Sequence, residues 1–65
     1  MLFKGRELKI GDKLISKRHG EITVSDMSER YFTARLADGS GRQWEYKGRD
    51  AYDVTWPEAP QGEDK

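Results

Sequence analysis

Alternating apolar and polar residues mark the middle of the chain as a set of short β-strands. Apolar side chains stand at every second position in 21–26, 31–37 and 42–47. This period of two is typical of strands with one buried face and one face in water. No comparable pattern predicts a helix. The predicted inward set is Ile22, Val24, Phe32, Ala34, Leu36, Trp44 and Tyr46.

The N-terminal part predicts one further strand and a lead-in segment. Residues 2–9 are expected to lie across one end of the sheet. Residues 13–17 form the first clear strand, with Leu14 inward, and a break follows at Arg18-His19-Gly20. His19 is interpreted as an exposed turn histidine, because it stands between Arg18 and Gly20 in this predicted turn.

Turn residues also organise the C-terminal part. Asp38-Gly39 is a strong hairpin signal, because type I′ turns need positive φ, and Gly41 predicts a longer loop or a bulge. A single 3₁₀ turn is expected at 48–51. Residues 51–56 predict a last short strand. Its expected common face is Tyr52, Val54 and Trp56.

These elements predict an all-β protein with a five-stranded barrel. Five short strands with glycine turns at close spacing are typical of small barrels and sandwiches, and the short chain favours the barrel. A length of 65 residues leaves room for one domain, which we place at 1–56. Residues 57–65 are rich in proline, glycine, glutamine and charge, and they predict a disordered acidic tail.

Several short motifs are similar to those of one family of small barrels. They are Ile10-Gly11-Asp12-Lys13-Leu14, Lys17-Arg18-His19-Gly20, Thr23-Val24 and Ala37-Asp38-Gly39. Together they resemble SH3-like barrels of the KOW and Tudor type, in particular the small Tudor-like domain at the C-terminus of bacterial DNA-repair helicases. The likeness covers about residues 8–47. It implies a five-stranded SH3-like barrel, and the partner specific to the helicases does not carry over.

Residue content gives little support to catalysis. The chain has no cysteine and a single histidine, so nucleophile–base pairs reduce to His19 with a serine. No spacing of three or more ligands suggests a metal site. The carboxylates of Asp50 and Asp53 fall at a predicted loop edge, where aspartate usually bonds the local backbone. We therefore predict that the chain is no enzyme and holds neither a metal ion nor another cofactor.

Charge and hydropathy constrain the environment of the protein. The chain has 12 basic and 12 acidic side chains, of which residues 1–56 hold 11 and 9. This mild excess differs from the dense positive stripe of a strong phosphate-binding surface. No apolar run is long enough for a signal peptide or a membrane span. We expect a cytoplasmic protein without a membrane partner.

Aromatic side chains provide the candidate binding surface. A barrel this small cannot enclose all of its inward aromatics, so at least one indole or phenol edge should reach the surface. Exposed tryptophan and tyrosine dominate interface energetics. We predict a small protein-binding module of a bacterium or phage. The candidate partner-binding residues are Tyr31, Arg35, Arg42, Trp44, Tyr46 and Lys47.

The sequence is also compatible with other ligands. Basic residues interleaved with an aromatic also suit single-stranded nucleic acid, which is the main alternative. An aromatic cage for methylated lysine, as in some Tudor relatives, is a narrower possibility. An exposed tryptophan or an open sheet edge allows either a monomer or a weak homodimer.

Overall fold

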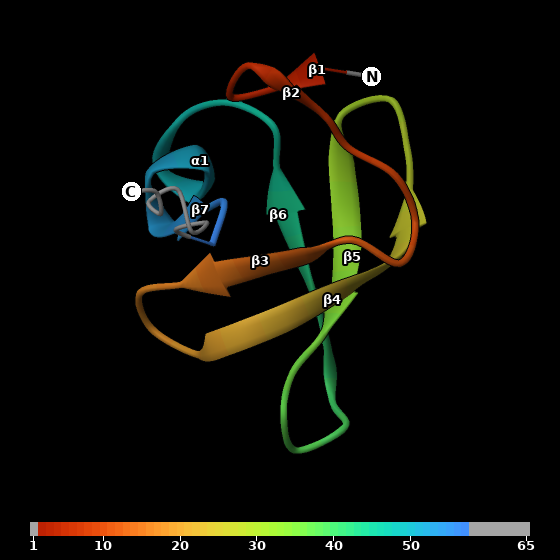
Figure 1. Ribbon diagram of the computed structural model, residues 1–65, viewed down its shortest axis with the longest axis vertical. Coiled ribbons are helices and arrows are strands. Elements are labelled where there is room, and N and C mark those ends of the chain that lie inside the picture. The colour runs from red at the N-terminus through yellow and green to blue at the C-terminus, as the bar shows by residue number, and fades with distance from the viewer. Residues whose placement is uncertain (1, 58–65) are drawn as a thin grey trace, which may run out of the picture.

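Seven short strands and one helical turn form the fold in the computed structural model, which describes residues 2–57 (Figure 1). The elements are β1 (Leu2–Phe3), β2 (Arg6–Glu7), β3 (Lys13–Ser16), β4 (Gly20–Met27), β5 (Tyr31–Arg35), β6 (Gly41–Glu45), α1 (Arg49–Asp53) and β7 (Val54–Thr55). The chain is therefore mostly β, as its alternation predicts.

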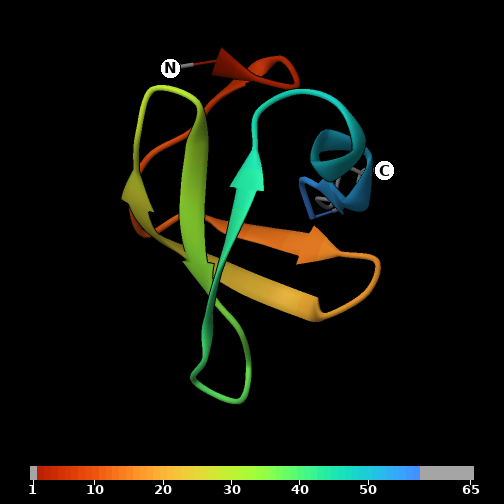
Figure 2. The ribbon, with the colours of Figure 1, turned by 180° about the vertical axis from the view of Figure 1, so that it is seen from behind.

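Five of the strands form one antiparallel sheet in the order β6-β5-β4-β3-β7. The long strand β4 pairs with β3 through its first half and with β5 through its second half. The register shifts between Val24 and Asp26, and such a bulge bends a strand. As a result, β3 runs across the direction of β5 and β6, and the sheet curls into a half-barrel (Figure 1, Figure 2).

The inner face of the half-barrel holds the hydrophobic core. Its buried side chains are Phe3, Leu8, Leu14, Ile22, Val24, Phe32, Ala34, Trp44 and Val54. Leu36 and Tyr46 are half-buried and pack against them. The inward parity predicted for the central strands is therefore confirmed. Aromatic stacking dominates the centre, where the rings of Phe32 and Trp44 lie 5.9 Å apart at 15°.

The N-terminal segment forms a small hairpin, β1–β2, that covers one end of the half-barrel (Figure 1). Its turn places Lys4 at φ 52° and Gly5 at φ 85°. The Lys4 ammonium donates to the carbonyl oxygen of Val54 at 2.6 Å. The Trp56 indole N–H donates to the carbonyl oxygen of Phe3 at 2.8 Å. These bonds attach the first strands to the last one.

The β5–β6 hairpin confirms the expected loop of more than two residues. The N–H of Gly39 donates to the carbonyl oxygen of Leu36 at 2.9 Å, and the N–H of Leu36 donates to the carbonyl oxygen of Ser40 at 2.7 Å. Gly39 lies at φ 93°, a conformation that glycine adopts at little cost. The Asp38 carboxylate accepts the N–H of Ser40 at 2.9 Å, which fixes the turn.

The prediction for residues 51–56 is wrong at its start. Tyr52 belongs to α1 and is 75% exposed, whereas an inward strand position was expected. Gly48, at φ 80°, begins a helical turn that runs to Asp53, so the strand shortens to β7. A helical turn before the last strand was expected and is present. Residues 58–65 of the predicted tail lie outside the described residues.

Replacing Trp56 with phenylalanine should weaken the attachment of the N-terminal hairpin. The Trp56→Phe variant keeps a ring near the Arg6 guanidinium, which lies 4.6 Å from the indole centroid, but loses the bond to Phe3. We expect the free energy of unfolding to fall by about 1–2 kcal/mol in urea titration. In the control, Tyr52→Phe, the change should stay within about 0.5 kcal/mol. Equal stability of both variants would contradict the role of this bond.

Candidate binding cleft beside the helix

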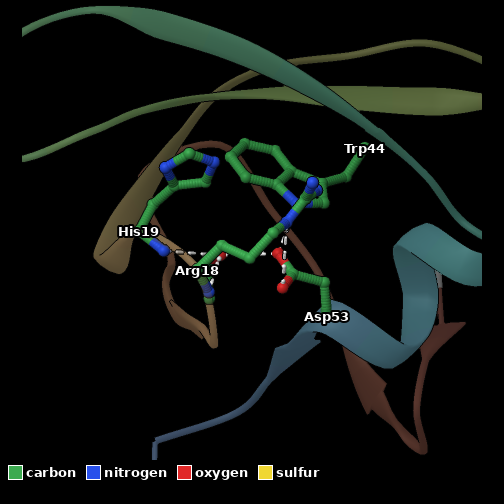
Figure 3. Close-up of polar contacts among 5 residues, drawn as sticks. Arg18, His19, Trp44 and Asp53 are labelled. Carbon is green, nitrogen blue, oxygen red and sulfur yellow. Dashed lines mark hydrogen bonds and ion pairs between the residues drawn. The ribbon is translucent and has the colours of Figure 1, made fainter.

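One carboxylate, that of Asp53 in α1, joins this helical turn to three other parts of the fold. Its Oδ2 accepts the hydroxyl of Ser16 at 2.5 Å and the indole N–H of Trp44 at 3.0 Å. Its Oδ1 lies 3.4 Å from Nε of Arg18. Figure 3 shows Arg18 and Trp44 converging on Asp53. We call this set the Asp53 network (Ser16, Arg18, Trp44 and Asp53), and it joins β3, the β3–β4 turn, β6 and α1.

The β3–β4 turn is ordered by the same serine. The Oγ of Ser16 accepts the backbone N–H groups of Arg18 and His19, both at 3.2 Å. The His19 ring packs edge-on against Trp44, with centroids 6.0 Å apart at 80° (Figure 3). His19 is half-buried, and its Nε2 is buried without a hydrogen bond among residues 2–57. The expectation of an exposed turn histidine is therefore wrong, because the Trp44 ring gives it an aromatic surface to cover.

Backbone and side-chain bonds hold α1 against both neighbouring strands. The carboxylate of Asp50 accepts the N–H of Glu45 at 3.0 Å. The carbonyl oxygen of Asp53 accepts the N–H of Lys17 at 2.7 Å. The Asp50 carboxylate therefore bonds nearby backbone, as its position at a loop edge predicts, whereas the Asp53 carboxylate bonds side chains of other elements. The helical turn is fixed between β6 and the β3–β4 turn (Figure 1, Figure 2).

An open hollow of about 510 Å³ lies between this turn and α1. We call it the basic cleft, and its lining residues are Lys17, Arg18, Arg49, Asp50, Tyr52 and Asp53. Tyr52 exposes its ring beside three cationic side chains. Large exposed aromatic rings contribute disproportionately to binding, because they bury much area at low cost in conformational entropy.

The formal charge of the basic cleft is positive overall, because its three cationic side chains outnumber its two carboxylates. Asp50 and Asp53 are occupied by the internal donors described above. Within residues 2–57, Lys17 and Arg49 make no side-chain hydrogen bond or ion pair. The Arg18 side chain is 64% exposed, so its pairing with Asp53 is screened by water. An anionic ligand would therefore meet cations that are already exposed.

The environment of Asp53 favours its charged form. Burial alone would raise the pKa of this carboxyl, but the hydrogen bonds from Ser16 and Trp44 and the nearby Arg18 guanidinium together hold the pKa below its usual value. Asp53 is therefore an anion at neutral pH, and it compensates part of the charge of Arg18.

The expectation that Trp44 belongs to an exposed surface is wrong. Its side chain is 1% exposed, because the ring stacks on Phe32 and its N–H bonds to Asp53 inside the protein. An indole with an internal acceptor does not need to reach water. Trp44 can therefore influence binding only through the residues that it supports.

The other candidate residues divide between two places along β5 and β6. Tyr46 and Lys47 line a hollow of about 480 Å³ together with Glu29, Arg30 and Glu45. Tyr31 lies directly across from Glu45 at its border. Burial raises the pKa of the Tyr46 phenol, whose hydroxyl donates to the carbonyl oxygen of Ser28 at 2.8 Å. This tyrosine is thus partly engaged in the fold.

Arg35 and Arg42 lie toward the opposite end of the same hairpin. Arg35 is paired with Gly41, and Arg42 is paired with Ala34. Both arginines are exposed, and within residues 2–57 neither makes an ion pair. The candidate residues therefore do not form one contiguous site, and their role in binding stays a prediction.

The basic cleft was missed by reasoning from the sequence. Lys17 and Arg18 are far from Arg49 in sequence, and the strand predicted at 51–56 places Tyr52 in the interior. The available signal was the glycine at position 48, followed by residues that can form a helical turn. In a strand, Tyr52 would share the buried face of Val54, but residues two apart in a helical turn do not face the same side, so Tyr52 lies in solvent.

Comparisons with known proteins found no match for the chain among protein-family models, curated proteins or solved structures. In the part of the chain that the structure describes, no three histidine or acidic side chains are grouped to hold a metal ion. The helical turn found there is also too short to cross a membrane. The geometry of the chain itself therefore carries the functional argument.

Replacing Asp53 with asparagine should destabilise the protein in a pH-dependent way. The folded pKa of Asp53 lies below its unfolded value, so its contribution is present above about pH 4 and is lost as the pH falls through the folded pKa. We expect Asp53→Asn to lower the free energy of unfolding by about 2 kcal/mol at pH 7, because hydrogen bonds to a charged acceptor are lost. Urea titrations between pH 7 and about pH 3 measure the difference, which should narrow below about pH 4.

Asp26→Asn is the matched control for this experiment. Asp26 is exposed on β4, and its side chain makes no hydrogen bond within residues 2–57. Its variant should stay within about 0.5 kcal/mol of the parent protein at each pH. A constant difference between Asp53→Asn and the parent across the whole pH range would show that the carboxylate charge has no special role.

Proposed function

We propose that the chain is a small, non-enzymatic binding module that recognises an acidic segment of another protein at the basic cleft. The observation that carries this proposal is the exposed Tyr52 ring among three cations, where the neighbouring carboxylates are occupied internally. Aromatic rings and arginine are enriched at the centres of protein interfaces. The basic cleft presents an aromatic ring and arginine side chains, and hydrogen bonds fix the backbone of the β3–β4 turn and of α1 that carries them.

The distribution of charge favours a protein partner over nucleic acid. Acidic residues are interleaved with basic ones along the strands, and the second hollow contains both Glu29 and Glu45. Glu45 is bonded through its N–H to the cleft residue Asp50, so a nucleic-acid backbone that extended from the cleft toward this hollow would approach carboxylates. A short acidic peptide segment need not extend that far. Local charge complementarity of this kind supports specific protein association.

The proposed fold type agrees with this role. We propose that the half-barrel is of the SH3-like kind, similar to KOW and Tudor domains. A five-stranded curled sheet with a helical turn before the last strand supports the proposal. Small barrels of this kind host many unrelated functions, so the function is argued from the site and not from the fold.

Removing the Tyr52 ring is expected to weaken partner capture most. In a pull-down from nuclease-treated lysate, Tyr52→Ala should retain the partner protein at least about tenfold less well, because aromatic hot spots contribute about 2 kcal/mol or more. Lys17→Ala and Arg49→Ala should have smaller effects, mainly at low salt. Quantitative mass spectrometry of the captured proteins gives the measurement. Lys13→Ala, an exposed lysine on β3 outside the cleft, is the control, and capture unaffected by all three cleft variants would refute the proposal.

The alternative partner, single-stranded nucleic acid, is favoured by one specific observation. Tyr52 beside cations could stack a base while Lys17 and Arg49 contact phosphates. For a protein-binding module we expect oligonucleotide binding no tighter than about 10⁻⁴ M at physiological salt. Fluorescence anisotropy with a mixed-sequence oligonucleotide tests this. Micromolar binding whose salt slope falls by about one in Lys17→Ala or Arg49→Ala would establish the alternative.

A further inference from the structure

One edge of the five-stranded sheet remains open along part of β6. Backbone bonds join Arg30 to Tyr46 and Leu36 to Ser40. Because bonded pairs alternate in an antiparallel ladder, the intervening residues 41, 43 and 45 direct their N–H and C=O groups away from β5. The bond from the Glu45 N–H to Asp50 agrees with this alternation.

Two other backbone groups at the sheet edges are occupied by side chains. At the other side of the sheet, the Lys4 ammonium occupies the carbonyl oxygen of Val54 in β7. On β6, Asp50 occupies the N–H of Glu45, and α1 lies beside that end of the strand (Figure 2). No side chain in residues 2–57 bonds to the backbone of Gly41 or Gln43. We call these two residues, with Arg42 between them, the open edge.

The open edge has a positive side chain at its centre. Arg42 is exposed and makes no ion pair within residues 2–57, and a hollow of about 660 Å³ borders it. Arg35 lies across from Gly41, and no side chain on Gly41 separates it from the edge. An added strand bonded to residues 41 and 43 would place one of its residues directly opposite Arg42, in the closely spaced, non-bonded position.

We propose that the open edge binds an extended acidic peptide by strand addition, with a glutamate or aspartate of the peptide opposite Arg42. Main-chain bonds to Gly41 and Gln43 hold the peptide, and the charge pair selects its sequence and register. This surface is separate from the basic cleft. It adds a second contact for a protein partner, and it does not require the cleft to be occupied.

The geometry disfavours a second copy of the chain as the occupant. The Glu45 N–H is occupied by Asp50, so of residues 41, 43 and 45 only Gly41 and Gln43 have both backbone groups available. Antiparallel pairing of two copies through these residues joins Gly41 of one copy to Gln43 of the other. That register places the two Arg42 side chains directly opposite each other. Like charges in this position destabilise a strand pair. An acidic peptide forms the same bonds with opposite charges.

Titration of isotope-labelled protein with short peptides tests the proposal. The probe is a capped heptapeptide of alternating threonine and valine with one central glutamate, and its partner probe has lysine instead. We expect chemical shift changes and slower amide exchange at Gly41 and Gln43. Binding should favour glutamate over lysine by about three- to tenfold. In Arg42→Glu the preference should reverse.

N-methylation of the peptide separates strand addition from simple charge attraction. In one peptide, the backbone nitrogens of the two residues immediately before and after the glutamate are methylated. This blocks their N–H bonds to residues 41 and 43 and should weaken binding about tenfold. A methyl group on the glutamate amide points away from β6 and should have little effect. Tyr52→Ala should bind the probe normally, which distinguishes this site from the cleft.

Four results would overturn the inference. They are the absence of binding, equal affinity for both peptides, shifts confined to the basic cleft, and equal effects of the two methylation patterns. Analytical ultracentrifugation of the free protein adds a further test. A dimer whose Gly41 and Gln43 amides are protected from exchange would identify a second copy as the occupant and overturn the inference.

Discussion

The fold depends on one hydrogen bond, because the indole N–H of Trp44 is buried and needs an acceptor. Trp44 is the largest side chain in the core, and leaving its N–H unpaired there would cost on the order of 1–3 kcal/mol. Asp53 supplies the acceptor, and the hydroxyl of Ser16 uses the same carboxylate oxygen. Because these residues lie on β6, α1 and β3, satisfying them draws both ends of the curled sheet together. The helical turn thus bridges the half-barrel where β6 and β7 are not paired with each other.

The surface of the basic cleft is a consequence of the same arrangement. Since Asp53 faces inward from α1, Tyr52, its neighbour in the helix, must face elsewhere, and it lies in solvent. Ser16 orders the β3–β4 turn by accepting two backbone N–H groups, and these bonds fix the backbone from which the Arg18 side chain extends. The cleft therefore needs no dedicated scaffold. Its aromatic ring and its cations are presented by residues adjacent to those that hold the core together.

The sequence predicted what depends on local alternation and missed what depends on distant contacts. The inward parity of β4, β5 and β6 is a property of each strand alone, and it is correct from Ile22 to Trp44. The burial of Trp44 depends on a carboxylate in α1, so parity could not decide whether its edge would be exposed. The β1–β2 hairpin was missed because its turn places Lys4 at a positive φ, where lysine is uncommon. The cleft was missed because its side chains come from two separate turns.

The sheet edges are protected unevenly, and the less protected part of β6 is the part that we propose to bind a strand. An open edge usually favours aggregation, and proteins cover it with charge, loops or helices. Here Lys4 donates to the Val54 carbonyl of β7 and Asp50 accepts the Glu45 N–H at one end of β6, while the open edge carries Arg42 at its centre. A single cation discourages pairing between copies but not with a strand of opposite charge. Arg42 therefore disfavours pairing between two copies of the chain, and the same side chain is the one that we propose to select an acidic partner strand.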